Sequence, residues 1–252
     1  MKVFFVGAGP GDPELLTVKA ERLLRNCRVC IYAGSLVSPA VLELLPPEAR
    51  RHDSAKLALE EIMALCRGAQ QADVDVLRLH SGDPAIYGAI REQMNGLDRL
   101  GIAYEVVPGV SSFQAAAAAL RAELTAPEVS QTIILARTSG RTPLPEEQEL
   151  ENLARTRATL CLFLSGAKIA TVAERLQGLY GNDCPAAVVY HASWPDQKIV
   201  RGTLADIGAV VKEAGIGQTS MIIVGRALAR EIPASKLYDA RFTHQFRQGR
   251  TE

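Results

Sequence analysis

The sequence has no excess of charge of either sign. Its 28 Lys and Arg residues balance 28 Asp and Glu residues over 252 positions, so the formal net charge is zero. Because sequence-independent nucleic-acid binding depends on an excess of positive charge, we expect no nucleic-acid partner. Charged residues make up 22% of the chain and apolar residues 48%, which is the composition of an ordinary globular protein.

A long apolar run is also missing. No stretch reaches the roughly 20 residues that cross a bilayer. The first residues, MKVFFVGAG, are typical of a first strand and not of a basic segment followed by a signal-peptide core. We therefore expect no membrane partner and a cytoplasmic protein.

Metal-binding patterns are absent as well. The five cysteines are odd in number and scattered, which is typical of reduced thiols in the cytoplasm. Cys27 and Cys30 form a C-x-x-C, but no second pair completes a zinc site. Alternation along a strand would point these two thiols to opposite faces, so core packing is the favoured interpretation. The four histidines show no metal-ligand spacing, and we expect no metal held by the protein.

What the first half contains is an alternation of short strands and helices. The patterns predict strands over residues 3–6, 28–32, 74–79 and 103–107, and helices over residues 13–25, 39–45, 57–67, 87–100 and 111–120. Short strands separated by helices of this length favour a mostly parallel sheet that is covered on both faces.

The second half restarts after a polar stretch, RAELTAPEVSQ (121–131), which is the best candidate for a linker. Strands are predicted over residues 132–138, 158–166, 184–192, 198–204 and 219–228, and helices over residues 168–179 and 204–214. This pattern predicts a mixed sheet. We expect an N-terminal α/β domain over 1–122, a C-terminal α/β domain over 131–230 and a polar tail over 231–252.

Gly-Asp-Pro occurs twice, in GAGPGDP (7–13) and in HSGDP (80–84), and each copy follows a predicted strand. Asp followed by Pro suits the N-cap and first turn of a helix, which explains part of the repeat. It does not explain why both loops, together with VVPGVSS (106–112), lie at the carboxyl ends of strands. Ligands bind at that edge of an open parallel sheet. The three loops predict a pocket with backbone donors, hydroxyls and little charge.

The first of these loops is a poor match to a dinucleotide-binding turn. Its third glycine, Gly11, comes one position early, and Asp12 stands where that glycine belongs. The second strand ends in IYAGS, without an acid to hold a ribose, and a carboxylate at the helix start would repel a pyrophosphate. No Gly-Lys-Ser/Thr follows, so a phosphate-binding P-loop is disfavoured too.

Four blocks taken in order resemble a known family. VGAGPGDPELLT, GDPAIYG, VPGVSS and ASWPDQKIVRGTL, spread from residue 3 to about residue 228, resemble the tetrapyrrole methylases, which use S-adenosylmethionine. IYGAIREQM, ELTAPEVSQTIILARTSGRTP and CLFLSGAKI are most similar to the members that methylate precorrin-4 at carbon 11, giving precorrin-5 in cobalamin (vitamin B12) biosynthesis. Ser81 and Gly88-Ala89 depart from the pattern of the uroporphyrinogen methylases.

The resemblance implies a two-domain tetrapyrrole methylase fold, normally a homodimer, with the cofactor in the interdomain cleft. Carried over motif by motif, it assigns twelve residues to the cofactor: Pro10, Ser81, Gly82, Asp83, Ile86, Tyr87, Ser111, Ser112, Leu164, Ala192, Thr219 and Met221. For the last four, ordinary packing is the alternative interpretation.

The tetrapyrrole substrate bears many carboxylates, which call for arginines and backbone donors. ARTSGRTP (136–143) is the best basic loop, so Arg137 and Arg141 are substrate-binding candidates. The resemblance adds Asp12, because it implies that the first Gly-Asp-Pro loop shapes the substrate side of the site. A solvated turn is the alternative for that loop.

No residue is assigned to catalysis. S-adenosylmethionine carries its own electrophile, and no nucleophile elbow or histidine relay is visible. Several alternatives stay open: a cobalt-precorrin-4 methyltransferase, a methylase of another precorrin, of uroporphyrinogen or of diphthamide precursors, and a non-catalytic S-adenosylmethionine-binding protein.

Overall fold

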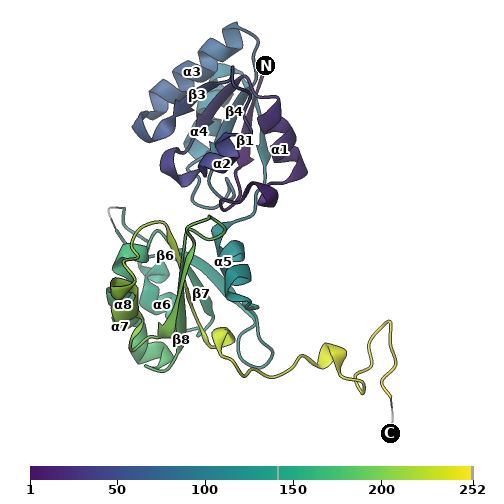
Figure 1. Cartoon of the computed structure of the whole chain (residues 1–252), viewed down its shortest axis with the longest axis vertical. Helices are drawn as coiled ribbons and strands as arrows, with labels where there is room; N and C mark the ends of the chain where they lie inside the picture. The colour runs from purple at the N-terminus through teal and green to yellow at the C-terminus, as the bar shows by residue number, and fades with distance from the viewer. Residues whose placement is uncertain (141, 251–252) are drawn as a thin grey trace. The chain divides into compact units, whose positions relative to one another are not determined.

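A computed structural model describes residues 1–140 and 142–250 of the chain. It consists of two compact units, each built on its own five-stranded sheet (Figure 1). The first unit contains Met1–Ala116 together with His191–Gln197. The second contains Ala117–Tyr190 and the described residues from Lys198 onward. Segment 191–197 therefore belongs to the first unit, although it lies far along the sequence.

The first unit has an all-parallel sheet in the order β3-β2-β4-β1-β5. Its strands are β1 Lys2–Gly7, β2 Val29–Tyr32, β3 Arg50–Asp53, β4 Val76–His80 and β5 Ala103–Val107. Its helices are α1 Val18–Arg25, α2 Pro39–Leu42, α3 Leu59–Gln71 and α4 Arg91–Leu100, while α5 Ser112–Leu120 begins in this unit and ends in the second. The predicted parallel sheet is confirmed.

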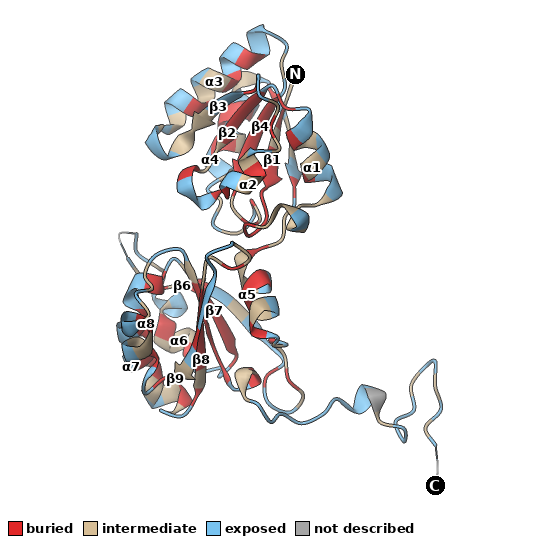
Figure 2. Cartoon of the chain, viewed as in Figure 1, coloured by how far each residue is buried: buried red, intermediate tan, exposed pale blue. Residues whose placement is uncertain are grey.

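Both faces of this sheet are covered by helices, as the strand pattern predicted. Leu24 of α1 and Val41 of α2 pack on one face with Val6 of β1. On the other face, Ile62 of α3 and Leu97 of α4 pack with neighbouring strand residues. Figure 2 shows the central strands as the most buried part of the unit, while the helices turn exposed faces outward.

The helix predicted over 13–25 is wrong as a single element. A 3-10 turn at Pro13–Leu15 is followed by a break, and α1 begins only at Val18, where the Thr17 hydroxyl accepts a hydrogen bond from Ala20 N at 3.1 Å. Val18, at the start of α1, is 85% exposed. Thr17 is a favourable N-cap, and its local hydrogen bond restarts the helix there.

The helix predicted over 87–100 also begins later, at Arg91. Tyr87 and Ala89 have φ values of 54° and 49°, in the left-handed region that an α-helix excludes. Strand β3, RRHD, was not predicted because it carries no apolar alternation and lies at the edge of the sheet.

Cys27 and Cys30 do not point to opposite faces of the sheet. Both belong to the same apolar core cluster, where interaction between the two thiols lowers the pKa of Cys27 and raises that of Cys30. The alternation argument failed because Cys27 precedes β2, which begins at Val29. Core packing, the favoured interpretation of the pair, is confirmed, since all five cysteines are free and buried.

The second unit has a mixed sheet in the order β6-β7-β10-β8-β9, as predicted. Only β6 and β7 run parallel; the other neighbours are antiparallel. The strands are β6 Ile133–Arg137, β7 Thr159–Phe163, β8 Pro185–Tyr190, β9 Lys198–Thr203 and β10 Ser220–Val224, and the helices are α6 Leu150–Ala154, α7 Ile169–Tyr180 and α8 Ile207–Glu213. The short helix α6 was not predicted.

One face of the second sheet packs on its three helices. Leu150 of α6, Leu176 of α7 and Ile207 of α8 join Leu162 of β7 in one buried cluster. On the opposite face of this sheet, residues such as Cys161 and Ile223 are buried as well. The Arg201 guanidinium of β9 donates to Leu120 O, at the end of α5, at 2.6 Å.

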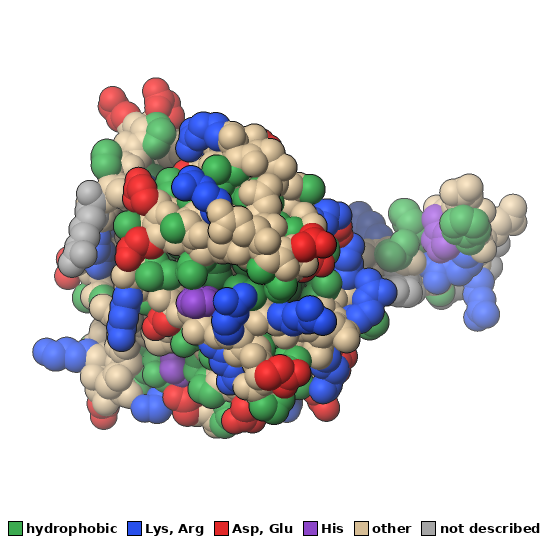
Figure 3. Space-filling model, turned by 90° about the horizontal axis from the view of Figure 1, so that it is seen from above, with side chains coloured by type: hydrophobic (Ala, Val, Ile, Leu, Met, Phe, Trp, Pro, Cys, Tyr) green, Lys and Arg blue, Asp and Glu red, His purple; other side chains and the backbone are tan. Residues whose placement is uncertain are grey.

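The surface carries charges of both signs. Basic and acidic side chains both occur across the face drawn in Figure 3. Among the described residues, no helix combines the length and the apolar character that a membrane span requires.

Two leucines at the end of β7 allow a matched test of this packing. Leu162 is fully buried in the second unit, whereas Leu164 is 75% exposed. We expect Leu162→Ala to lower the free energy of unfolding by about 2–5 kcal/mol, because it leaves a cavity. Leu164→Ala should change it by less than about 0.5 kcal/mol. Urea unfolding of both variants provides the measurement, and equal losses would contradict the described core.

Candidate ligand-binding loops

The three predicted loops meet at the carboxyl edge of the first sheet. Gly9 and Gly82 form a bridge in which Gly82 N donates to Gly9 O at 2.8 Å and Gly9 N donates to Gly82 O at 3.3 Å. The third loop joins them through Gly109 N, which donates to Asp83 Oδ2 at 2.9 Å. The three loops follow β1, β4 and β5, which are neighbours in the sheet, and they therefore lie together in the first unit.

This meeting depends on a close approach of backbones. A Cβ atom on Gly7 would lie 2.6 Å from Gly109 Cα, and one on Gly109 would lie 2.3 Å from Gly82 O. Real Cβ atoms do not approach backbone atoms so closely. Glycine at positions 7 and 109 is therefore required for the loops to touch.

The two Gly-Asp-Pro copies form the same capped turn. Asp12 Oδ1 accepts from Glu14 N at 2.9 Å, and Asp83 Oδ1 accepts from Ala85 N at 2.7 Å. Their second contacts differ. Asp83 uses its other oxygen for Gly109 N, whereas the Asp12 backbone N–H donates to Ser193 Oγ at 3.0 Å. The repeat thus combines one capping geometry with two different connections.

Segment 191–197 is anchored on the first loop. Trp194 Nε1 donates to Pro10 O at 2.7 Å. A Cβ atom on Gly11 would lie 2.0 Å from Trp194 Cδ1, so the indole packs directly against this glycine. Through these contacts Trp194 anchors segment 191–197 on the first loop.

The same segment holds a histidine–carboxylate pair that the sequence analysis missed. His191 Nδ1 lies 3.0 Å from each carboxylate oxygen of Asp196, and the imidazole stacks on Trp194 with ring centroids 4.4 Å apart. The sequence signal for this pair is a His and an Asp that lie five residues apart, with a Trp-Pro turn between them. The pair fixes the imidazole orientation within the segment.

The remaining candidates of the first unit lie in the second and third loops. Gly82 has a φ of 63°, and a Cβ there would lie 3.5 Å from Ser111 Cα. Ser111 is buried and its N–H donates to Gln114 Oε1 at 2.9 Å, next to Ser112 at the start of α5. Other candidates with a described position are Ser81 and Ile86, both half-buried, Tyr87, which is 47% exposed, and the buried Pro10 and Ala192.

A second group of candidates lies in the second unit. Leu164 follows β7, and Gly166 close by packs so tightly on Ser220 that a Cβ would lie 2.0 Å from Ser220 Oγ. Ser220 Oγ in turn donates to Gly217 O at 2.8 Å, which brings Thr219 to the same place. Met221, also predicted, is buried within this unit.

Strained backbone concentrates at the candidate residues. Ten described non-glycine residues have positive φ, and Tyr87, Leu164 and Thr219 are among them. Three more are Ala89, in the same loop as Tyr87, and His191 and Ser193, which flank the candidate Ala192. Such conformations persist where surrounding structure enforces them, and they cluster at ligand-binding sites. Tyr87 and Leu164 also keep large apolar surfaces exposed.

The predicted basic loop is held by its own first arginine. The Arg137 guanidinium donates to Thr142 O and Pro143 O, each at 3.1 Å. Thr138 N, in the same loop, donates to Ser165 Oγ at 3.1 Å, beside Leu164. Arg141, the other predicted substrate residue, lies outside the described residues.

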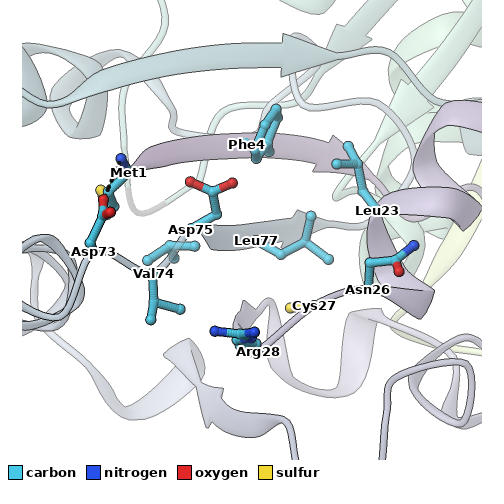
Figure 4. A pocket seen from close by; sticks show the side chains of 11 residues that line it. Met1, Phe4, Leu23, Asn26, Cys27, Arg28, Asp73, Val74, Asp75 and Leu77 are labelled. Carbon is cyan, nitrogen blue, oxygen red and sulfur yellow. Dashed lines mark hydrogen bonds and ion pairs between the residues drawn. The ribbon is translucent and has the colours of Figure 1, made fainter.

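A pocket of the first unit lies at the opposite edge of its sheet (Figure 4). It has a volume of about 450 Å³, and its lining includes Phe4, Cys27, Arg28 and Leu77, near the amino ends of β1, β2 and β4. Asp75, also in the lining, accepts a hydrogen bond from Lys2 N at 2.6 Å. None of the predicted site residues lines this pocket. Within residues 1–140 and 142–250, no His, Cys, Asp and Glu side chains gather in a metal-binding group.

Taken together, these contacts place the first unit in the class of α/β proteins in which loops at the carboxyl edge of a parallel sheet present backbone groups and hydroxyls. The chain belongs to the Tetrapyrrole (Corrin/Porphyrin) Methylases, because the model of this family matches residues 2–208. The family resemblance is confirmed.

Individual relatives agree with this family. A precorrin-4 C(11)-methyltransferase from Pseudomonas aeruginosa is 51% identical over 250 residues, covering 99% of this chain and 100% of the relative. The X-ray structure of a cobalt precorrin-4 methyltransferase has a TM-score of 0.88 and 44% identity, over 90% of this chain and 96% of that one. A uroporphyrin-III C-methyltransferase from Thermus thermophilus, complexed with S-adenosylhomocysteine, has a TM-score of 0.76 and 30% identity, over 90% of this chain and 93% of that one.

The different connections of the two Gly-Asp-Pro turns predict different responses to the same substitution. Both carboxylate oxygens of Asp83 accept a backbone N–H, and Asp83→Asn replaces one of them with an NH₂ group, which cannot accept. One backbone N–H loses its acceptor, so the free energy of unfolding should fall by about 1–2 kcal/mol. Asp12→Asn should cost less than about 0.5 kcal/mol, because Asn and Asp cap equally well. Urea unfolding of both variants measures the difference. Equal effects would show that the Asp83–Gly109 hydrogen bond does not hold the loops together.

Proposed function

We infer that this protein is an S-adenosylmethionine-dependent methyltransferase that methylates precorrin-4 at carbon 11, giving precorrin-5 in cobalamin biosynthesis. The observation that carries this inference is the 51% identity, over nearly the full chain, to a precorrin-4 C(11)-methyltransferase. Relatives named for precorrin-4 and for cobalt precorrin-4 are both similar, so the assay below uses both macrocycles.

The loops of the first unit fit a nucleoside cofactor of low charge. At Gly82, positive φ and the missing side chain leave the backbone open toward Ser111. The carboxylate of Asp83 accepts two backbone N–H groups, so in this proposal it holds the loop. Ile86 and Tyr87 supply apolar surface, while Ser81, Ser111 and Ser112 supply hydroxyls.

The remaining assignments follow the family motifs. Pro10 is assigned to the cofactor through its backbone, because Trp194 already holds the Pro10 carbonyl in place. The proposal also assigns Ala192, Leu164, Thr219 and Met221 to the cofactor. For Met221 and Ala192, which are buried, backbone contacts are the expected contribution.

When bound, S-adenosylmethionine would supply an electrophilic methyl group, which a nucleophilic macrocycle carbon would take in line while S-adenosylhomocysteine leaves as the neutral thioether. The chain's contribution is therefore placement. Rigid loops that align reacting groups can account for as much as about 7–11 kcal/mol of a barrier. The capped turns and glycine contacts at the first sheet's edge supply that rigidity.

Substrate carboxylates are assigned to the basic loop over 136–143. Arg137 shapes this loop by donating to three of its carbonyl groups, Thr138 O, Thr142 O and Pro143 O. Arg141 is assigned to a carboxylate arm of the macrocycle, and Asp12 to the substrate side of the first loop. Guanidinium groups suit this task because they form paired hydrogen bonds with carboxylates.

We also propose that the chain forms a homodimer in the cytoplasm. Ile133 and Leu135 lie on one face of the edge strand β6 and are each 37% exposed, which offers apolar surface to a second copy. Five free, buried thiols suit a reducing compartment.

The proposed reaction predicts transfer of labelled methyl from S-adenosylmethionine to precorrin-4 or its cobalt form, with carbon 11 as the site of the new bond. Gly82→Val should abolish S-adenosylhomocysteine binding, because a branched side chain at φ 63° crowds the space between Gly82 and Ser111. Calorimetry measures binding, and mass and NMR analysis of the product locate the methyl group.

Gly178→Ala is the matched control, because its Cβ meets no atom within 4 Å. It should bind S-adenosylhomocysteine as wild type does. Labelling of no precorrin by the wild-type protein would refute the proposed reaction, and unchanged affinity in Gly82→Val would refute the assigned cofactor site.

For the basic loop, we expect Arg141→Ala to raise KM for the macrocycle by at least about tenfold, the loss associated with a charge-assisted hydrogen bond. The affinity for S-adenosylhomocysteine should stay unchanged. Arg155→Ala, at an exposed arginine of the same unit, is the control. If Arg141→Ala and Arg155→Ala have the same KM as wild type, the loop is only a solvated turn.

A further inference from the structure

A buried arginine, Arg78, lies three residues before Ser81 of the second Gly-Asp-Pro loop. Arg78 of β4 is 7% exposed, yet it forms no salt bridge with any carboxylate in residues 1–140 and 142–250. Its titratable neighbours on packed elements are Cys30, Cys66 and His80. A buried cation without a carboxylate is unusual, because desolvation opposes its charge.

The neighbours of Arg78 are neutral groups. Burial raises the pKa of the Cys66 thiol to about 11, and burial together with Arg78 lowers the pKa of His80 to about 3. The pKa of Arg78 itself falls to about 10, chiefly through burial, so the guanidinium is charged at neutral pH. Its partners are hydrogen-bond acceptors: Gln93 Oε1 at 2.9 Å, Ile31 O at 3.2 Å and Leu79 O at 3.4 Å.

The contact with Gln93 fixes the direction of that side-chain amide. Arginine carries only donors, so the amide must turn its oxygen toward Arg78. Its NH₂ group then faces the other way, where Nε2 donates to Ala89 O at 2.8 Å. Gln93 is 5% exposed and lies on α4. Arg78 and Gln93 thus connect the sheet core to the backbone of the second loop.

The carbonyl at the end of this connection belongs to a strained segment. Tyr87 and Ala89 both have positive φ, and a Cβ on Gly88 between them would lie 2.1 Å from Pro84 O. Backbone in such conformations needs external support to persist. Arg78 and Gln93 provide this support at the Ala89 carbonyl.

We propose that Arg78 and Gln93 are positioning residues for the methyl-donor cofactor, holding residues 83–89 through Ala89 O in the conformation that presents Ile86 and Tyr87. This inference rests on the proposed function, because the cofactor contacts of that loop are assigned there. Neither side chain is assigned a contact with the cofactor itself.

Gln93→Glu separates positioning from stability. A glutamate still accepts from the Arg78 guanidinium, but a carboxylate has no hydrogen to donate to Ala89 O. We expect the urea midpoint to stay at or above that of wild type. Amide hydrogen exchange in residues 84–90 should accelerate without ligand, and the Kd of S-adenosylhomocysteine should rise about three- to tenfold, as for one lost hydrogen bond.

Two further variants make the result specific. Gln177→Glu removes an equivalent donor, Nε2 to Leu204 O at 2.7 Å in the second unit, and should leave the Kd unchanged. Gln93→Met removes both hydrogen bonds and should loosen the loop while also lowering the urea midpoint.

A wild-type protein that does not bind S-adenosylhomocysteine overturns the proposed function and this inference together. If wild type binds, unchanged exchange and Kd in Gln93→Glu overturn this inference alone. Exchange that accelerates evenly throughout the first unit overturns it too, because that result marks a general structural role.

Discussion

The site depends on the close approach of three backbone segments at the carboxyl edge of the first sheet. Gly7 and Gly109 leave no room for side chains, and Gly9 and Gly82 exchange two backbone hydrogen bonds. The carboxylate of Asp83 then ties the second loop to the third. Parallel strands bring their carboxyl ends to one edge, and these contacts turn that edge into a defined surface. The methylase activity requires such a surface, because the cofactor brings the reactivity and the protein supplies placement.

Around this surface, strained backbone segments are held by specific hydrogen bonds. Tyr87, Ala89, His191 and Ser193 all adopt left-handed backbone conformations in the first unit. Each lies in a segment with a specific anchor: Gln93 bonds to the carbonyl of Ala89, and Trp194 and Ser193 bond to the first loop. The cost of strained backbone is met by buried hydrogen bonds and packing, which explains how exposed loops keep a definite shape.

Much of this architecture was predictable because its signals are local. Alternating strands and helices predicted the parallel sheet, and Asp-Pro after glycine predicted both capped turns. The predictions failed where contacts between distant parts of the sequence determine where an element begins or whether it forms. The helix predicted from Tyr87 begins at Arg91 because the loop before it is held by a residue of α4, and β3 has no apolar alternation. The Arg78–Gln93 contact joins positions 15 apart, and Trp194 reaches Pro10 across 184 positions, so no local pattern contained either.

The most direct test of the account is a crystal structure of this protein with S-adenosylhomocysteine bound. The account predicts that the thioether product contacts residues 81–87 and 109–112 of the first unit, with the Gly9–Gly82 bridge and the Asp83–Gly109 hydrogen bond intact. Electron density for the product away from these residues, for example in the pocket lined by Phe4, Arg28 and Leu77, would contradict it.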